Sequence, residues 1–216
     1  MTELTVLQAV RLKGRVSPAD LAATLSKELG DITNIVEQLT ASGLLVDGTT
    51  LRLTPSGRAR LETLLTEERE GIDPAAMAAA YEEFRAVNAD FKSLVMDWQL
   101  KGGLKGGLKG GLKAGQARKP NSHDDAEYDA AVLARLDDVH ARVVPIIEAA
   151  ATQLPRLNAY LAKLLAALDK VKAGETAWLS RPLIDSYHTV WFELHEELIL
   201  AVGLTREEAA RSGDAQ

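Results

Sequence analysis

Residues 17–65 read SPADLAATLSKELGDITNIVEQLTASGLLVDGTTLRLTPSGRARLETLL, and the fold is predicted mainly from this segment. Ser17 is typical of an N-cap residue and Pro18 of a first helical position, so a helix is predicted from there to Gly30. A further helix is predicted from Asp31 to Gly43, because apolar residues recur on one face at helical spacing. Those residues are Ile32, Ile35, Val36 and Leu39.

A hairpin and a fourth helix complete this unit. Two short strands are predicted at residues 44–46 and 51–53, joined by a tight turn at Asp47-Gly48. Thr54-Pro55-Ser56-Gly57 then opens a helix to about Glu68. Upstream, apolar residues from Leu4 to Leu12 predict a first helix that ends at Gly14. Helix, helix, helix, hairpin, helix is the order of a helix-turn-helix followed by a β-wing, and a winged helix is expected over residues 1–70.

This segment resembles the winged helix of MarR-like bacterial transcription regulators, above all in the run ASGLLVDGTTLRLTPSGRARL at residues 41–61. The resemblance covers about a third of the chain and implies binding to double-stranded DNA, with the third helix in the major groove. On its outer face, Thr33, Asn34 and Gln38 carry groups suited to base edges. Lys27 and Arg52 are candidates for phosphate contacts.

The charge of the third helix favours a different interpretation. It contains no lysine or arginine and carries Asp31 and Glu37. Because phosphate contacts normally supply most of the affinity for DNA, a winged helix retained for protein contact is the alternative.

A long helix is predicted over residues 71–100, after Asp73-Pro74. Residues spaced alternately by four and three form a heptad seam with one polar member. They are Met77, Tyr81, Phe84, Asn88, Phe91, Val95 and Trp98. The seam is either packed in a helical bundle or is a homodimer interface in which Asn88 sets the register.

Residues 101–120 are predicted to be a flexible linker, because Lys-Gly-Gly-Leu occurs three times and half of the repeat is glycine. Its lysines either contact phosphate non-specifically or only keep a low-complexity segment in solution. Residues 121–216 predict three more helices, at about 124–154, from Pro155, and from a Ser180 cap to Val202. With the 71–100 helix they suggest a four-helix bundle or an extended dimer-forming domain, so the fold class is mainly α.

Composition narrows the function classes. The chain has no cysteine, which excludes disulfides and thiolate metal sites. No apolar run reaches the roughly 20 residues that span a bilayer, and the first residues do not resemble a signal peptide, so a cytoplasmic protein without membrane contact is expected. Net charge is −6, and only residues 101–120 are strongly basic, unlike a wholly basic nucleic-acid-binding protein.

All four histidines lie in the C-terminal region. Together with nearby acidic residues and a tyrosine, they predict a pocket for a small ligand. The candidate ligand-binding residues are His123, Asp125, His140, Asp185, Tyr187, His188, His195 and Glu196. The alternatives are histidines that only pack between helices, or a metal site. His188 and His195 are about 10.5 Å apart along a helix, which is awkward for one ion, so neither metal nor cofactor is expected.

The stretches NSHDDAEYDAAVLARLDDVHAR and WLSRPLIDSYHTVWFELHEELILAVGL resemble actinobacterial proteins with a MarR-type N-terminus. The resemblance singles out Asn121 and Glu193 in addition to the candidates already named. No nucleophile–base motif or phosphate loop indicates an enzyme. We expect a homodimeric DNA-binding transcription regulator whose helical domain serves dimerisation or a small-molecule effector. The alternative is an interaction or regulatory module that does not bind DNA, linked by resemblance to phosphoenolpyruvate-utilising enzymes. A helical metalloprotein is a third hypothesis.

Overall fold

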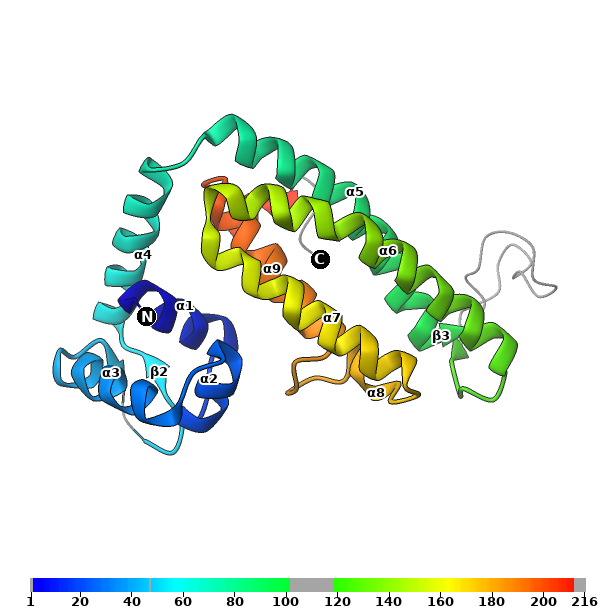
Figure 1. The fold of residues 1–216 in the computed structure, drawn as a ribbon, viewed down its shortest axis with the longest axis horizontal. Coiled ribbons are helices and arrows are strands. Elements are labelled where there is room, and N and C mark those ends of the chain that lie inside the picture. The colour runs from blue at the N-terminus through cyan, green and yellow to red at the C-terminus, as the bar shows by residue number, and fades with distance from the viewer. Residues whose placement is uncertain (1, 47, 102–118, 212–216) are drawn as a thin grey trace.

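The computed structural model describes residues 2–46, 48–101 and 119–211. These residues form ten α-helices, one 3-10 turn and two small antiparallel sheets, which confirms the mainly α class. Buried apolar side chains form two separate clusters, one within residues 6–65 and one within residues 77–209. We call the first part the N-terminal unit and the second part the bundle; Figure 1 shows them side by side, joined through α4 and α5.

The N-terminal unit follows the predicted order of elements. It consists of α1 (Glu3–Lys13), α2 (Pro18–Leu25), α3 (Leu29–Ala41), β1 (Leu45–Val46), β2 (Arg52–Leu53) and α4 (Pro55–Glu70). The strands are antiparallel, with Leu45 opposite Leu53, and Val16 adds a bridge to Leu51. Both bridge residues are buried, so the hairpin is joined to the helical core at this point.

Local capping chemistry explains where two of these helices begin. The Ser17 hydroxyl accepts from the Asp20 amide at 3.1 Å, and the Thr54 hydroxyl accepts from the Gly57 amide at 2.9 Å. Gly57 also permits a close approach, because a Cβ there would lie 2.0 Å from the Leu44 carbonyl oxygen. The start of α4 therefore packs against the backbone of Leu44, the residue before β1, at a position that only glycine can occupy.

The boundary between the second and third helices was predicted wrongly. Helix α2 ends at Leu25, because Ser26 adopts a left-handed conformation (φ 52°) and the Lys27 amide turns back to the Ala22 carbonyl. Helix α3 begins at Leu29 and includes Gly30. Leu29 is 50% exposed and belongs to α3 rather than to the second helix.

The bundle is built on two long antiparallel helices, α5 and α6, which lie side by side in Figure 1. Its elements are α5 (Pro74–Gln99), α6 (Ala126–Gln153), the 3-10 turn η1 (Pro155–Asn158), α7 (Ala159–Lys172), α8 (Ala177–Ser180), α9 (Tyr187–Ala201) and α10 (Arg206–Arg211). The heptad seam of α5 is buried inside the chain, and Asn88 Oδ1 accepts from Trp191 Nε1 at 2.9 Å. The bundle interpretation of the seam is confirmed. Within this chain the partner of Asn88 is therefore Trp191.

Three further boundaries differ from expectation. The last long helix is capped by Ser186 rather than Ser180, because Leu183 has a positive φ of 68° that interrupts the helix. Asp125 itself caps α6, accepting from the Tyr128 amide, so this helix begins at Ala126 rather than at about residue 124. The predicted linker is bounded by paired strands β3 (Leu100–Lys101) and β4 (Lys119–Pro120), while residues 102–118 lie outside the described residues. None of the helices in the described part combines the length and apolarity needed to cross a bilayer.

Candidate functional site

The outward face of α3 carries the residues predicted to contact DNA bases. Thr33, Asn34 and Gln38 are exposed, while the opposite face of the helix is buried in the core of the N-terminal unit. Figure 1 places α3 at the side of the N-terminal unit that is remote from the bundle. The face is therefore accessible to another macromolecule without movement of the bundle.

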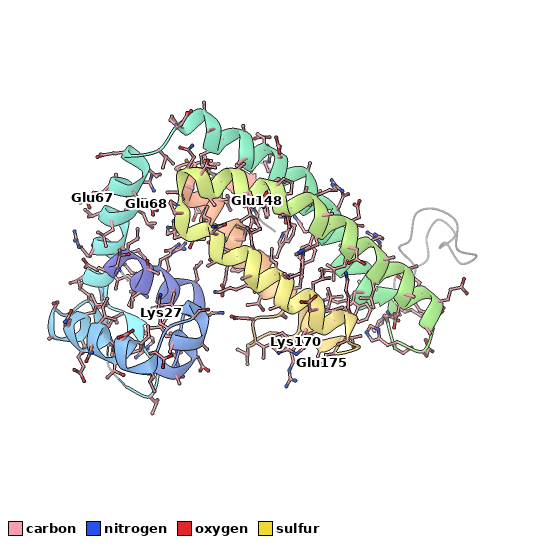
Figure 2. The ribbon with its side chains drawn as sticks, in the orientation of Figure 1. Lys27, Glu67, Glu68, Glu148, Lys170 and Glu175 are labelled. Atoms are coloured by element: carbon pink, nitrogen blue, oxygen red, sulfur yellow. The ribbon has the colours of Figure 1, made fainter. Side chains whose placement is uncertain are left out.

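Charges around this face are divided between its flanks and its centre. Lys27, labelled in Figure 2, lies in the turn between α2 and α3, and Arg52 lies on β2. Both residues are exposed. Asp31 and Glu37 are exposed on α3 itself. The Thr33 hydroxyl donates to the Leu29 carbonyl at 2.9 Å, which leaves the methyl group of Thr33 for external contact.

The other side of the N-terminal unit meets the bundle through α1, at a contact that we call the junction. Lys13 Nζ lies 2.5 Å from Asp185 Oδ1 and 2.7 Å from Glu193 Oε1. The Glu193 side chain is only 4% exposed. Burial by itself would lower the pKa of Lys13, but the charge of Glu193, with help from Asp185, outweighs it and the pKa is raised. Lys13 is thus held as a cation between two bundle carboxylates.

A second ionic contact lies one helical turn farther along α9. Arg156 Nη1 is 2.6 Å from Glu197 Oε2, and the same guanidinium donates to both carboxylate oxygens of Glu68 on α4. Burial would lower the pKa of Arg156, yet the two carboxylates raise it, with Glu197 contributing most. Gln8 Nε2 on α1 also donates to Glu197 Oε2, at 2.9 Å. Arg156 therefore connects α4 to α9 next to the α1 contact.

Ionic rather than apolar contacts dominate the junction. Arg11 adds an ion pair with Glu196 at 3.3 Å, and Arg69 donates to the Leu200 carbonyl. The two hydrophobic clusters do not merge, and Leu200 is the bundle residue that packs, partly buried, against the core of the N-terminal unit. Such an interface resembles those between domains that change their relative position.

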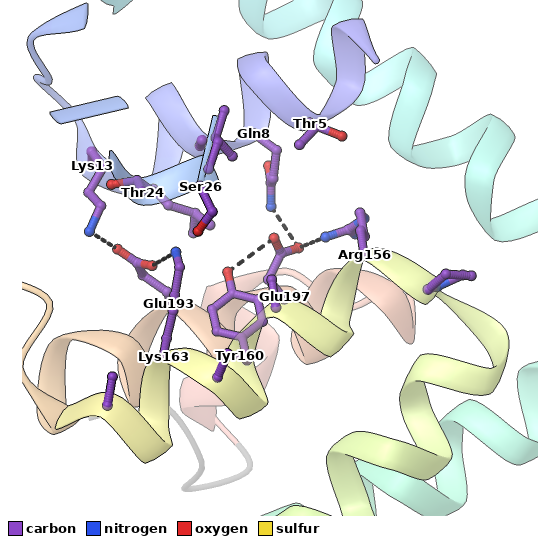
Figure 3. Close-up of a pocket in the computed structure, with 17 residues that line it drawn as sticks. Thr5, Gln8, Lys13, Thr24, Ser26, Arg156, Tyr160, Lys163, Glu193 and Glu197 are labelled. Atoms are coloured by element: carbon purple, nitrogen blue, oxygen red, sulfur yellow. Dashed lines mark hydrogen bonds and ion pairs between the residues drawn. The ribbon is translucent and has the colours of Figure 1, made fainter. Parts of the chain in front are cut away.

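A cavity of about 670 Å³ lies within the junction (Figure 3). It is lined by α1, the end of α2, η1, α7 and α9. Its polar lining includes Gln8, Lys13, Arg156, Tyr160, Lys163, Glu193 and Glu197. Much of the remaining wall consists of alanine and leucine side chains, so the cavity combines an apolar surface with charged groups, as ligand pockets commonly do.

Two of the predicted ligand-binding residues lie at the junction: Asp185 pairs with Lys13, and Glu196 pairs with Arg11. A second pair lies inside the bundle, where His140 Nδ1 is 3.2 Å from the Tyr187 hydroxyl. Burial lowers the pKa of His140 and raises that of Tyr187.

The remaining predicted residues are dispersed. His188 is exposed beside Phe91, and His195 is buried against Phe84, with ring centroids 5.4 Å apart. His123 is near the N-terminus of α6, with Nδ1 3.0 Å from Asp129 Oδ2, and Asp125 acts as the cap described above. The predicted residues therefore do not form one pocket. Among the described residues, no group of three histidine, aspartate or glutamate side chains could hold a metal ion.

The residues that line the cavity were largely missed from the sequence. The sequence did contain one signal, because Glu193, Glu196 and Glu197 lie in a segment that is otherwise mostly apolar. The structure shows that all three side chains are buried in α9. Buried carboxylates need partners, so cations elsewhere in the chain were implied. Their identity was not readable, because Lys13 and Gln8 are about 180 residues away along the chain.

Comparison of the chain with protein-family models, with curated proteins and with solved structures gave no match. Two parts of the molecule remain as functional candidates on their geometry: the outward face of α3 and the junction with its cavity.

Proposed function

We propose that the chain is a DNA-binding transcription regulator, and that residues 1–70 are a winged helix of the MarR-like kind. The order of elements supports this, with α2 and α3 as the helix-turn-helix and β1–β2 as the wing. The single observation that carries the proposal is the outward face of α3, which is exposed and polar and lies away from the bundle.

In this proposal α3 lies in the major groove of double-stranded DNA. The amides of Asn34 and Gln38 pair with adenine edges, and the Thr33 methyl contacts a thymine methyl. Lys27 and Arg52 contact phosphates on either side of the groove, while Asp31 and Glu37 keep non-specific affinity low. Few phosphate contacts imply a shallow dependence of binding on salt concentration.

The bundle then controls where α3 is presented. In a homodimer, the spacing of the two α3 helices must match the half-site spacing of the DNA. Because the junction is ionic, a small change in it moves the whole N-terminal unit about the α4–α5 connection. An effector that binds one arrangement better than the other shifts the population toward it.

The test is selection of genomic DNA fragments by the purified full chain, followed by sequencing. The proposal predicts enrichment of a few defined sites, and loss of this enrichment in the double variant Asn34→Ala, Gln38→Ala. Asn158→Ala with Gln99→Ala is the matched control, because it removes the same two chemical groups from exposed positions of the bundle. Absence of any enriched site with the wild-type chain overturns the proposal.

The acidic centre of α3 favours a second candidate, a regulatory module that contacts protein. Within Leu29–Ala41 there is no lysine or arginine, so a basic protein surface is a better electrostatic partner than phosphate. The resemblance stated for the C-terminal stretches makes phosphoenolpyruvate-utilising enzymes the partner class to examine. This candidate predicts a stable complex with such an enzyme that the Asn34→Ala, Gln38→Ala variant weakens, with no enriched DNA.

A further inference from the structure

Two polar groups in the wall of the cavity make no hydrogen bond within the described chain. Gln8 is 2% exposed, and its Oε1 has no partner although its Nε2 donates to Glu197. The Lys163 side chain is 17% exposed, and its nearest carboxylate oxygen, on Glu193, is 3.9 Å away, too far for a hydrogen bond. Burial lowers the pKa of Lys163 accordingly. One acceptor and one donor of the protein are thus available at the same cavity.

The space beside these groups results from small side chains. On α7, Ala159, Ala162 and Ala166 follow one another at helical spacing on the face that lines the cavity, opposite Ala9 and Leu12 of α1. All three alanines are exposed to solvent, so their methyl groups form an accessible apolar surface on α7. An apolar strip is therefore left along one wall, next to the Lys163 ammonium and the Gln8 Oε1 atom.

The charges at the cavity are nearly balanced. Lys13 is neutralised by Glu193 and Asp185, and Arg156 by Glu197 and Glu68. With Lys163 included, three cations face four carboxylates, so the site does not attract an anion. A cationic ligand would be repelled by the ammonium of Lys163, which makes no hydrogen bond to a carboxylate. An uncharged ligand suits the site best.

We propose that this cavity binds an uncharged amphipathic small molecule. An N–H or hydroxyl of the ligand donates to Gln8 Oε1, a carbonyl oxygen accepts from Lys163 Nζ, and an aliphatic body lies along the alanines of α7. Because it contacts α1 and α7 together, the ligand stabilises the contact between the N-terminal unit and the bundle. Its role as an effector rests on the proposed function, whereas its binding requires no DNA.

Four probes with the same six-carbon chain test the ligand chemistry by NMR titration of the free full chain. They are hexanamide, N,N-dimethylhexanamide, hexanoate and hexylammonium. Hexanamide has both the donor and the acceptor without charge, and each lost hydrogen bond weakens binding roughly threefold to tenfold. We expect hexanamide to bind most tightly. Tighter binding of hexanoate or hexylammonium overturns the assignment, as does the absence of hexanamide binding, which would mean that the cavity holds water only.

Two variants locate the binding. Ala162→Leu places a larger side chain on the alanine strip of the cavity and should abolish hexanamide binding, whereas Ala134→Leu, at an exposed position of α6, should leave it unchanged. Lys163→Met retains the aliphatic stem and should weaken hexanamide binding several-fold; its fold is checked by circular dichroism. Hexanamide binding that survives Ala162→Leu contradicts the proposal. Because no DNA is present, failure here leaves the DNA-binding proposal intact, and loss of DNA selection leaves this assignment intact.

Discussion

Replacement of Lys13 by methionine tests whether ion pairs hold the N-terminal unit against the bundle. Methionine keeps most of the aliphatic stem of the side chain and removes the ammonium. Glu193, which is 4% exposed, is left with Lys163 at 3.9 Å as its nearest remaining cation. Asp185 is 34% exposed and can turn toward solvent. The cost therefore arises mainly at Glu193.

The size of the expected loss in the free energy of unfolding follows from the burial of Glu193. Removing one partner of a fully buried ion pair costs about 3–5 kcal/mol, whereas an exposed pair is worth about 0–1 kcal/mol. Lys163 partly compensates the charge of Glu193, so we expect Lys13→Met to lower the free energy of unfolding by about 2–3 kcal/mol. Glu193→Gln in the same chain should restore part of this loss, because the uncompensated buried charge is gone.

Urea unfolding can follow the two parts separately. The three tryptophans, Trp98, Trp178 and Trp191, all lie in the bundle, so their fluorescence reports the bundle alone. Circular dichroism at 222 nm reports the helices of both parts. In Lys13→Met the circular dichroism transition should begin at lower urea than the fluorescence transition, because the N-terminal unit loses the support of the bundle.

Lys27→Met is the matched control, since Lys27 is exposed and should change stability by less than about 0.5 kcal/mol. Two results would show that the Lys13–Glu193 ion pair does not stabilise the junction. One is a Lys13→Met chain within about 0.5 kcal/mol of the wild type; the other is a double variant with Glu193→Gln in which the two effects simply add.

Four further predictions concern the fold. Gly57→Ala should destabilise the chain by at least about 2 kcal/mol in thermal or urea unfolding, because its Cβ would meet a backbone carbonyl at 2.0 Å; Gly30→Ala, with open space around a helical position, should stabilise it by about 0.5–1 kcal/mol. Burial lowers the pKa of His140 below its ordinary 6.5, so the unfolded chain binds the proton more readily. The contribution of neutral His140 to the free energy of unfolding is therefore fully present above about pH 6.5, and it is lost as the pH falls through the folded-state pKa. His140→Gln should reduce the dependence of the free energy of unfolding on pH, measured between about pH 7.5 and 5. Asn88→Leu should cost about 1–3 kcal/mol, because it leaves the indole N–H of Trp191 without its buried acceptor, and an unchanged unfolding midpoint would contradict this.

Local chemistry made much of the N-terminal unit predictable. Ser17-Pro18 and Thr54-Pro55 predict helix starts, because an N-cap hydroxyl and a first-turn proline favour a helix through contacts within its first turn. The end of α2 was not predictable in the same way. It depends on a left-handed Ser26, and no glycine marks that position.

Longer-range features were predictable only in part. The heptad pattern of α5 identifies which face is buried, but not whether its partner is a second copy or another helix of the same chain. The answer depends on Trp191, which is 103 residues beyond Asn88. Histidine content likewise suggested one pocket, whereas the tertiary fold separates His123, His140 and His195. The cavity depends on α1 meeting α9, which no local pattern encodes.

The claim that the outward face of α3 contacts DNA is tested most directly by site-specific photo-crosslinking in living cells. A photoreactive amino acid replaces Thr33 in one full-length chain, and Ala134, on the exposed side of the bundle, in a control chain. We predict that the Thr33 position captures double-stranded DNA at a few defined sites and that the Ala134 position does not. Capture of protein without DNA at Thr33, or equal capture of DNA at both positions, would contradict the account.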